Sequence, residues 1–411
     1  MSRIITATFV LLFAASGAVR AEPTIAAATP DETPAQASPA VESGPVAFDF
    51  ALIGDFPYTE EDLERMPALL ADLGAAPGLA FLVHLGDIHG KLESPGCSDL
   101  LYQSRIDGLV GTGLPWVITP GDNDWTDCDG SEGTTLERLA AFRRMFHPNP
   151  GRSWGPGGFA LRHQGDIPGY EPFIENAIWE RDGVVFATLH MVQPAMRAVR
   201  QGDAEGEAYK AVLRDAARAW LGVAFDHAEA IDARGVFLAT QASLWPNSAR
   251  PDFNYYVNPG IAEPSEFMAP FVADLLDRTR RFRRPVVLAN GDTHYFRIDK
   301  PLADEARAML ENFTRVEGFG SPHGHWVWVR VEPERAEVFS FRQEIVEDNR
   351  FTLTPPDQRP PRVETGWEGL MRAVRAVRLA TPALALVGAS TLFAGTLVVL
   401  RWIWRAVRGR L

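Results

Sequence analysis

The middle of the chain alternates short apolar runs with longer polar or amphipathic segments. Apolar runs of this length are typical of strands in a sheet that is covered on both faces. Strands are predicted at Phe48–Ile53, Leu79–Leu85, Trp116–Thr119, Val184–Leu189, Val236–Ala239, Val286–Ala289, His325–Val331 and Ala336–Phe341.

Helical periodicity fills several of the intervals between these runs. Leucine and methionine side chains from Glu60 to Leu73 recur at the spacing of one helix face. Further helices are predicted at Leu136–Phe146 and at roughly Glu207–Asp232. Alternating strands and helices predict an α/β fold, and residues 47–358 are long but acceptable for a single domain.

The first residues predict export. Residues 1–21 combine an early Arg3, an apolar core and small residues before a cleavage point after Ala21, as in a secretory signal peptide. An uncleaved anchor is the alternative, but the apolar run is short for a membrane span. Residues 22–46 are rich in Ala and Pro and lack aromatic side chains, which predicts a disordered spacer.

The other end of the chain predicts a membrane anchor. Residues 379–400 carry no charge and are long enough for a transmembrane helix, after a juxtamembrane linker at 359–378. A basic cytoplasmic tail at 401–411 follows. A buried core helix and a processed sorting signal are the alternatives. We therefore expect a single-pass protein of the cell envelope with residues 47–358 outside the cytoplasm.

Charge is divided unevenly along the chain. The whole sequence carries −13, residues 1–21 carry +2 and residues 359–411 carry +7, which leaves −22 for residues 22–358. So acidic a domain lacks the clustered Lys and Arg of a nucleic-acid-binding surface. An anionic substrate would have to be attracted by bound cations. No protein partner can be inferred.

The sequence contains two cysteines, Cys97 and Cys128. Each follows shortly after a predicted strand end, so they are expected on neighbouring loops. In an exported protein such a pair predicts a disulfide, with free buried thiols as the alternative.

Four Gly-Asp pairs each follow an apolar run: Gly54-Asp55, Gly86-Asp87, Gly121-Asp122 and Gly291-Asp292. A single pair would indicate no more than a turn, because Gly-Asp is common where a strand ends. Ligands bind at the carboxyl ends of strands in open α/β sheets, so four pairs predict that the aspartates converge. Carboxylates that close repel one another unless a cation lies between them, which predicts a metal site.

The order of these motifs between residues 49 and 342 resembles the calcineurin-like metallophosphoesterases, the superfamily that includes the purple acid phosphatases. The family pattern is Asp-x-His, Gly-Asp, Gly-Asn-His-Asp/Glu, a lone His and Gly-His-x-His. The corresponding segments are Asp55-Phe56-Pro57, Gly86-Asp87, Gly121-Asp122-Asn123-Asp124, Thr240-Gln241 and Gly291-Asp292-Thr293-His294. The resemblance implies a two-sheet α/β sandwich that hydrolyses a phosphomonoester or phosphodiester by two-metal activation of water.

The resemblance also implies a ligand set for two divalent ions, with Asp87 bridging them. The implied ligands are Asp55, Asp87, Asp122, Asp292, His294 and Gln241. Gln241 stands at the lone-His position and offers only a carbonyl oxygen, whereas Pro57 replaces a ligating His and cannot bind. A set so rich in oxygen favours Mn²⁺, Mg²⁺ or Ca²⁺ over Zn²⁺, and iron is also compatible.

The resemblance implies the catalytic side chains less clearly than it implies the metal ligands. Asn123 replaces the family's leaving-group histidine and cannot act as a general acid. His89 and His190 are candidate replacements, although a histidine at a strand end is as often structural. The resemblance further suggests that Tyr58, Lys91, Asp124 and Trp125 contact the substrate or orient its partners.

A second hypothesis follows from the differences between this sequence and the family pattern. Because Pro57 and Gln241 replace two ligating histidines, the domain could be a catalytically weak or inactive metal-binding module at the cell surface. A dinucleotide-dependent enzyme is disfavoured, because no Gly-x-Gly-x-x-Gly follows the first strand.

Overall fold

The computed structural model describes residues 44–90, 96–128, 133–194, 204–245, 264–306 and 308–350. The predicted signal peptide, nearly all of the spacer, Lys91, and the linker, membrane helix and tail predicted from residue 359 lie outside the described residues. Among the helices within those ranges, none combines the length and apolar character needed to cross a bilayer.

The strands form two sheets, which confirms the predicted α/β fold. The five-stranded sheet has the order β12-β11-β1-β2-β3 and comprises β1 (Phe48–Ile53), β2 (Leu79–His84), β3 (Trp116–Ile118), β11 (Trp326–Val331) and β12 (Phe339–Glu344). The seven-stranded sheet has the order β4-β5-β6-β7-β8-β10-β9 and comprises β4 (Arg162–His163), β5 (Ala177–Arg181), β6 (Val184–Thr188), β7 (Gly235–Ala239), β8 (Val286–Asn290), β9 (Arg297–Asp299) and β10 (Phe313–Glu317).

The strand predictions were incomplete at the edges of the sheets. The strands β4, β5, β9 and β10 were not predicted, and β12 begins at Phe339 instead of Ala336. The later start has a local cause. The chain turns between Glu332 and Val338, where the Glu332 N–H donates to the Val338 carbonyl and Val338 adopts a φ of 57°.

Helices cover the outer faces of the sheets. They are α1 (Glu60–Ala75), α2 (Asp99–Gly111), α3 (Thr135–Phe146), α4 (Ala204–Ala230) and α6 (Ala269–Phe282), with short 3₁₀ helices η1 (Gln164–Asp166) and η3 (Glu347–Asn349). Helix α1 starts where the pattern predicts, because Thr59 and Asp62 form a capping box in which each side chain accepts the other's N–H. Helices α2 and α6 were not predicted.

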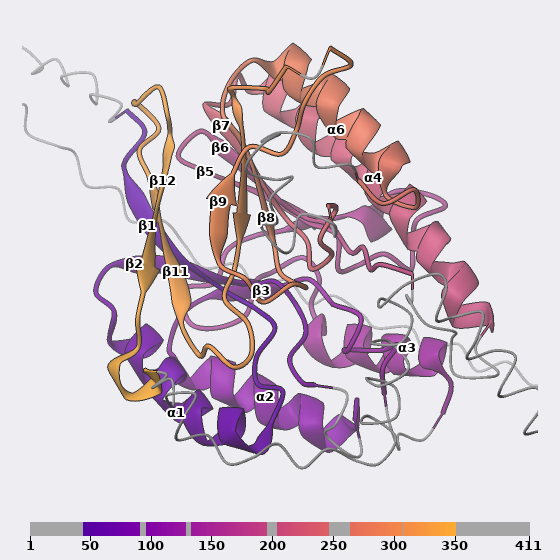
Figure 1. Ribbon diagram of the computed structural model, residues 1–411, viewed down its shortest axis with the longest axis vertical. Helices are drawn as coiled ribbons and strands as arrows, with labels where there is room; N and C mark the ends of the chain where they lie inside the picture. The colour runs from indigo at the N-terminus through magenta and orange to yellow at the C-terminus, as the bar shows by residue number, and fades with distance from the viewer. Residues whose placement is uncertain are drawn as a thin grey trace, which may run out of the picture. The chain divides into compact units, whose positions relative to one another are not determined.

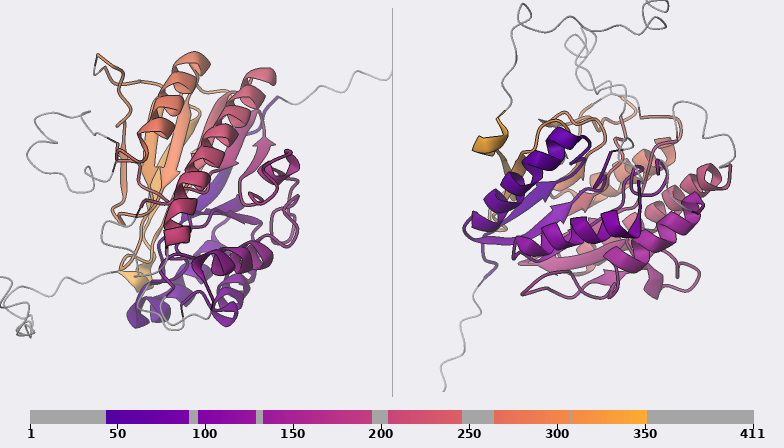
Figure 2. Two further views of the ribbon diagram at one scale, coloured as in Figure 1. Left: turned by 90° about the vertical axis from the view of Figure 1, so that its right-hand side faces the viewer. Right: turned by 90° about the horizontal axis from the view of Figure 1, so that it is seen from below.

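Large apolar clusters hold these layers together. Phe50, Phe81, Phe186 and Phe237 belong to the cluster that both sheets share, and their rings stack or meet edge to face. A second cluster joins the other face of the five-stranded sheet to α1, α2 and α3, and a third joins the seven-stranded sheet to α4 and α6. Figure 1 shows α4 and α6 outside the seven-stranded sheet, and Figure 2 shows that these two helices run side by side.

The direction of the strands brings their carboxyl ends to common edges. The central strands β1, β2 and β3 are parallel, as are β6, β7, β8 and β10. Strand β8 leads to Asp292, and the Asp292 N–H donates to Asp55 Oδ1 at 2.9 Å. The carboxyl edges of the two sheets therefore meet at the aspartates.

Candidate metal centre

All four predicted aspartates lie at this meeting point of the two sheets. Asp55, Asp87 and Asp122 follow β1, β2 and β3, and Asp292 follows β8. Asp55 and Asp87 are buried, with 0% and 2% of their surface exposed, whereas Asp122 and Asp292 are partly open to solvent. The centre thus has two enclosed carboxylates and two at its opening.

The backbone at this centre is held in an uncommon conformation. Asp55, Asp87, Asp292 and His294 have φ values of 52°, 55°, 77° and 59°, in the left-handed region that few non-glycine residues adopt. Such conformations carry a free-energy cost and cluster at functional sites. They turn the chain sharply at the strand ends, so that the carboxylates point across the edge of the sheets.

The glycines of the Gly-Asp pairs provide room for these carboxylates. A Cβ atom on Gly291 would lie 1.9 Å from Asp55 Oδ2, and one on Gly121 would lie 2.0 Å from Asp87 Oδ1. No side chain tolerates such contacts. The sequence motif therefore serves close approach as well as the turn.

Neutral donors surround Asp87. Its Oδ2 accepts hydrogen bonds from the Tyr58 hydroxyl, from Gln241 Nε2 at 3.0 Å and from Asn123 Nδ2 at 3.2 Å. Its Oδ1 accepts the Asn123 backbone N–H at 3.1 Å. Tyr58, Asn123 and Gln241 thus lie against the carboxylates, and Gln241 presents its amide nitrogen instead of the carbonyl oxygen expected of a metal ligand.

The carboxylate of Asp55 accepts fewer hydrogen bonds than that of Asp87. Its Oδ1 accepts the Asp292 N–H and a longer hydrogen bond of 3.4 Å from Gln241 Nε2. Its Oδ2 is buried without a hydrogen-bond partner. An ionised carboxylate with an unpartnered buried oxygen is costly, so this oxygen requires a proton or a cation.

His294 is oriented as a ligand would be. Its Nδ1 lies 2.8 Å from the Ser321 carbonyl oxygen, so Nδ1 carries the proton and Nε2 keeps a free lone pair. Nε2 lies 3.9 Å from Asp55 Oδ1. Burial lowers the pKa of His294, which favours the neutral ring that binds metals.

Electrostatic repulsion is strong within the cluster. Burial raises the pKa of Asp55 and of Asp87 well above the usual range, with further increases from the charge of Asp292 on Asp55 and of Asp122 on Asp87. Burial also raises the pKa of Asp122, and burial together with the Asp122 charge raises the pKa of Asp292 to about 7. In the described part of the chain, no Lys or Arg forms a hydrogen bond or ion pair with these four carboxylates.

As the side chains stand, no three His, Cys, Asp or Glu residues in the described ranges are spaced to hold one ion. The donor set nevertheless fits a hard divalent cation, because carboxylate oxygens are joined by one imidazole. The unpartnered Asp55 Oδ2 gives this fit a structural basis.

The two candidate general acids are not bonded to the cluster. His89 Nδ1 lies 3.0 Å from the Gly90 carbonyl oxygen and Nε2 lies 3.3 Å from Cys97 Sγ. His190 Nδ1 lies 2.7 Å from Glu175 Oε1, and its buried Nε2 has no partner. Both rings are completely buried, so neither reaches a substrate in this arrangement.

Asp124 and Trp125 have structural surroundings. The two oxygens of Asp124 accept backbone N–H groups from Asp87, Ile88 and Gly121 at 2.7–2.8 Å, which joins the loops after β2 and β3. Trp125 has 0% of its surface exposed and packs edge to face against His190. A fully buried indole cannot touch a substrate, so the predicted contact of Trp125 with substrate has no support here.

Two residues at the centre were not predicted. Glu317 ends β10, is fully buried, and accepts a hydrogen bond from Arg297 Nε at 2.5 Å; its charge raises the pKa of Asp55 and Asp292. Ser321 fixes His294 through its carbonyl oxygen, and its N–H donates to the Asp55 carbonyl at 2.8 Å. The short strand β10 gave no apolar signal, and Ser321 acts mainly through its backbone.

The predicted disulfide between Cys97 and Cys128 is confirmed, with a Cα–Cα distance of 5.3 Å. It joins the loop before α2 to the loop that follows Asp122, and Cys97 Sγ lies 3.2 Å from the Asn123 carbonyl oxygen. The bond therefore braces the segment that positions Asn123.

Removing this bond is expected to destabilise the protein. With Cys97→Ala and Cys128→Ala together, the free energy of unfolding should fall by about 3 kcal/mol, because the unfolded chain loses a closed loop. Urea unfolding of both proteins measures the difference, with reductant added to the wild type as the control. An unchanged midpoint would contradict the bracing role.

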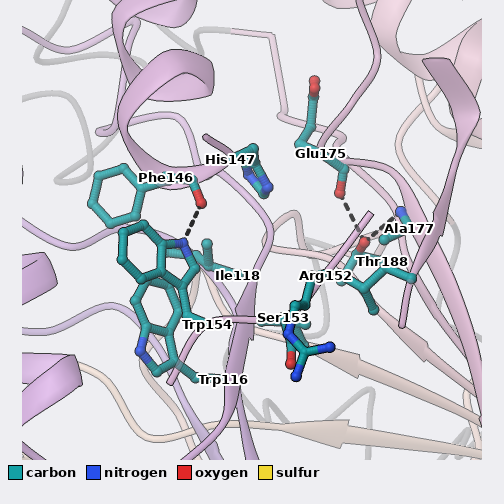
Figure 3. A pocket seen from close by; sticks show the side chains of 12 residues that line it. Trp116, Ile118, Phe146, His147, Arg152, Ser153, Trp154, Glu175, Ala177 and Thr188 are labelled. Atoms are coloured by element: carbon teal, nitrogen blue, oxygen red, sulfur yellow. Dashed lines mark hydrogen bonds between the residues drawn. The ribbon is translucent and has the colours of Figure 1, made fainter. Parts of the chain in front are cut away.

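A separate cavity lies away from the cluster. It is lined by residues that include Trp154, His147 and Arg152. Figure 3 shows the stacked indoles of Trp116 and Trp154 on one side and Arg152 and Ser153 on another. None of the predicted site residues lines it, so the pocket and the carboxylate centre are distinct.

Comparisons with known proteins leave the family open. No family model matches the sequence, and no curated protein matches it significantly. Among solved structures, the fold is similar to one described as "GAP50 the anchor in the inner membrane complex of Plasmodium", with a TM-score of 0.38 and 11% sequence identity over 73% of this chain and 89% of that chain. A likeness of this degree says nothing about activity.

Proposed function

We propose that this protein is a metal-dependent hydrolase of phosphoric esters, related to the calcineurin-like metallophosphoesterases. The carrying observation is the Asp55 carboxylate, which is fully buried, has an unpartnered oxygen and lies beside the free Nε2 of His294. The four carboxylates lack a bonded Lys or Arg in the described residues, so a bound cation would supply the missing positive charge.

Asp55, Asp292 and His294 would hold the cation, with Mn²⁺, Mg²⁺ or Ca²⁺ favoured over Zn²⁺ by the oxygen-rich set. A divalent cation lowers the pKa of a bound water and offsets charge on phosphoryl oxygens. Asp122 and Asp292 are partly open to solvent, and Lys210 is the cationic side chain whose charge acts on Asp122, so an anionic substrate would meet mainly negative charge. Cation binding and substrate binding are therefore coupled.

Three further side chains position the carboxylates in this proposal. Tyr58 and Asn123 hold Asp87 by hydrogen bonds, and Asp124 fixes the two loops from which Asp87 and Asp122 project. The proposal also includes export, a C-terminal membrane anchor and a substrate of the cell envelope. These rest on the sequence of residues 1–21 and 379–400.

A second candidate function is a metal-binding cell-surface module without catalysis. The observation that favours it is the placement of His89 and His190, since neither ring bonds to the aspartates. Without a histidine to protonate the leaving group, only substrates with a good leaving group would turn over quickly.

Hydrolysis assays distinguish the two candidates. The full-length protein should hydrolyse a generic phosphomonoester or phosphodiester in Mn²⁺ and show no turnover in chelator. Asp87→Asn should lower turnover roughly tenfold or more, because the substitution weakens the hydrogen bonds that position Tyr58 and Gln241. Folded protein that binds Mn²⁺ but hydrolyses neither ester would favour the non-catalytic module.

A further inference from the structure

Asp87 Oδ2 has no lone pair left for a metal ion. A carboxylate oxygen offers about two lone-pair positions. The Tyr58 hydroxyl, Gln241 Nε2 and Asn123 Nδ2 all donate to Oδ2, whereas Oδ1 accepts the Asn123 backbone N–H and packs against Gly121. A cation bound at Asp87 Oδ2 would have to displace at least one of these donors.

Gln241 is the donor that stands between the two buried carboxylates. Its Nε2 lies 3.0 Å from Asp87 Oδ2 and 3.4 Å from Asp55 Oδ1. Facing two carboxylates, the amide must present its nitrogen, because the carbonyl oxygen would add repulsion. A donor in this position occupies the space in which a second cation would contact Asp87.

The Gln241 side chain is held firmly in place. It has 1% of its surface exposed, and its backbone carbonyl accepts the Gly291 N–H at 3.0 Å. A Cβ atom on Gly121 would lie 2.5 Å from Gln241 Cγ, so the chain is packed directly against that glycine. Rotation of the amide out of the cluster is opposed by this packing.

Asp55, His294 and Asp292 each keep a ligand atom without a hydrogen-bond partner among the described residues. These atoms are the unpartnered Asp55 Oδ2, the His294 Nε2 lone pair and Asp292 Oδ1, since Asp292 Oδ2 already accepts the Ser243 N–H at 2.9 Å. These three residues provide two oxygens and one nitrogen, which suits one divalent ion that also binds water.

We infer that the cluster holds a single divalent cation at Asp55, Asp292 and His294, and that Gln241 closes the second position by donating its side-chain amide to Asp87 and Asp55. The inference rests on the proposed metal dependence and refines it, since the sequence resemblance implies two ions. A single ion would activate water without a second ion to bind the leaving group.

Manganese stoichiometry tests the inference independently of activity. The full-length protein is loaded with Mn²⁺, desalted and measured by elemental analysis and electron paramagnetic resonance. The wild type should hold about one ion per chain, with the spectrum of an isolated ion. Gln241→His and the equally long Gln241→Glu should raise the content to about two, with the spectrum of a coupled pair. Gln103→His, which adds an exposed histidine on α2, should change nothing.

Each alternative outcome is decisive. Two coupled ions in the wild type would overturn the single-ion inference and leave the proposed metal dependence standing. One ion in both folded Gln241 variants would show that Gln241 does not close the second position. No bound manganese in the wild type would overturn the proposed function itself.

Discussion

Asp55→Asn is expected to remove the bound cation, lower phosphoester turnover by a factor of about 10³, and raise the stability of the cation-free protein. The asparagine has nearly the same shape and keeps one oxygen, so the fold should be retained. It cannot carry the negative charge that attracts the cation. The same change therefore affects activity and stability in opposite directions.

The gain in stability follows from the burial of Asp55. Its carboxyl group is fully buried, one oxygen has no partner, and its pKa is raised well above the usual range first by burial and then by the Asp292 charge. At pH 8 without metal, the native state holds this group at a cost that a neutral amide avoids. A free-energy cost from a buried charge is tolerated where function requires that charge.

Two measurements check the prediction. Urea unfolding in chelator at pH 8 should give a higher midpoint for Asp55→Asn than for the wild type, and elemental analysis should find no manganese in the loaded variant. Glu64→Gln, which changes an exposed carboxylate on α1, should leave both values unaltered. A destabilised variant that still binds manganese would contradict the assignment of Asp55.

The sequence predicted the parts of the fold that depend on burial. The runs that became β1, β2, β6, β7 and β8 are almost wholly apolar, since both faces of these strands are covered. The edge strand β9 is only three residues long, and β10 has Thr314 and Arg315 in its middle, so neither has a distinctive pattern. Tertiary pairing, not local preference, makes them strands.

The unpredicted helices have different explanations. Helix α2 carries exposed apolar side chains, with Leu100 at 85% and Val110 at 42% exposure, and these interrupt its helical period. Helix α6 does have a regular apolar face that includes Phe271, Leu275 and Phe282. Its pattern could have been recognised from the sequence.

At the centre, the sequence predicted which residues meet but not which hydrogen bonds they form. The four Gly-Asp pairs identify the aspartates, because each pair ends a strand. The hydrogen bonds that Tyr58 and Gln241 donate to Asp87 depend on loop conformations that no local pattern encodes. For the same reason His89 and His190 were plausible acids until their partners, Cys97 and Glu175, were known.

The carboxyl cluster is expected to destabilise the cation-free protein increasingly as the pH rises from about 6.5 to 8. The pKa values of Asp55, Asp87 and Asp122 are raised by burial, and that of Asp292 is raised to about 7 from an ordinary value near 3.8. In this range the unfolded state has released these protons while the native state still binds some of them. Through these groups, each added unit of pH therefore favours unfolding.

The buried histidines act in the opposite direction over part of this range. Burial lowers the pKa of His84 to about 3 and that of His147 to about 4, and it lowers the pKa of His190, His294 and His325 below the ordinary 6.5. The unfolded rings lose their protons around pH 6.5, so the histidines add stability with rising pH up to about 7.5 and contribute no slope above it. Asp292→Asn keeps all of these histidines, so its difference from the wild type isolates the Asp292 contribution, which is no more than about 1.4 kcal/mol per pH unit.

Urea unfolding in chelator at several pH values tests this directly. Relative to Asp292→Asn, the wild type should lose free energy of unfolding from pH 6.5 to 8. With excess Mn²⁺ the slope should reverse, because the cation binds the ionised carboxylates of the native state and competes with their protons. The same slope in the wild type and in Asp292→Asn in chelator would mean that Asp292 is ionised throughout this range, which would remove the electrostatic basis of the proposed site.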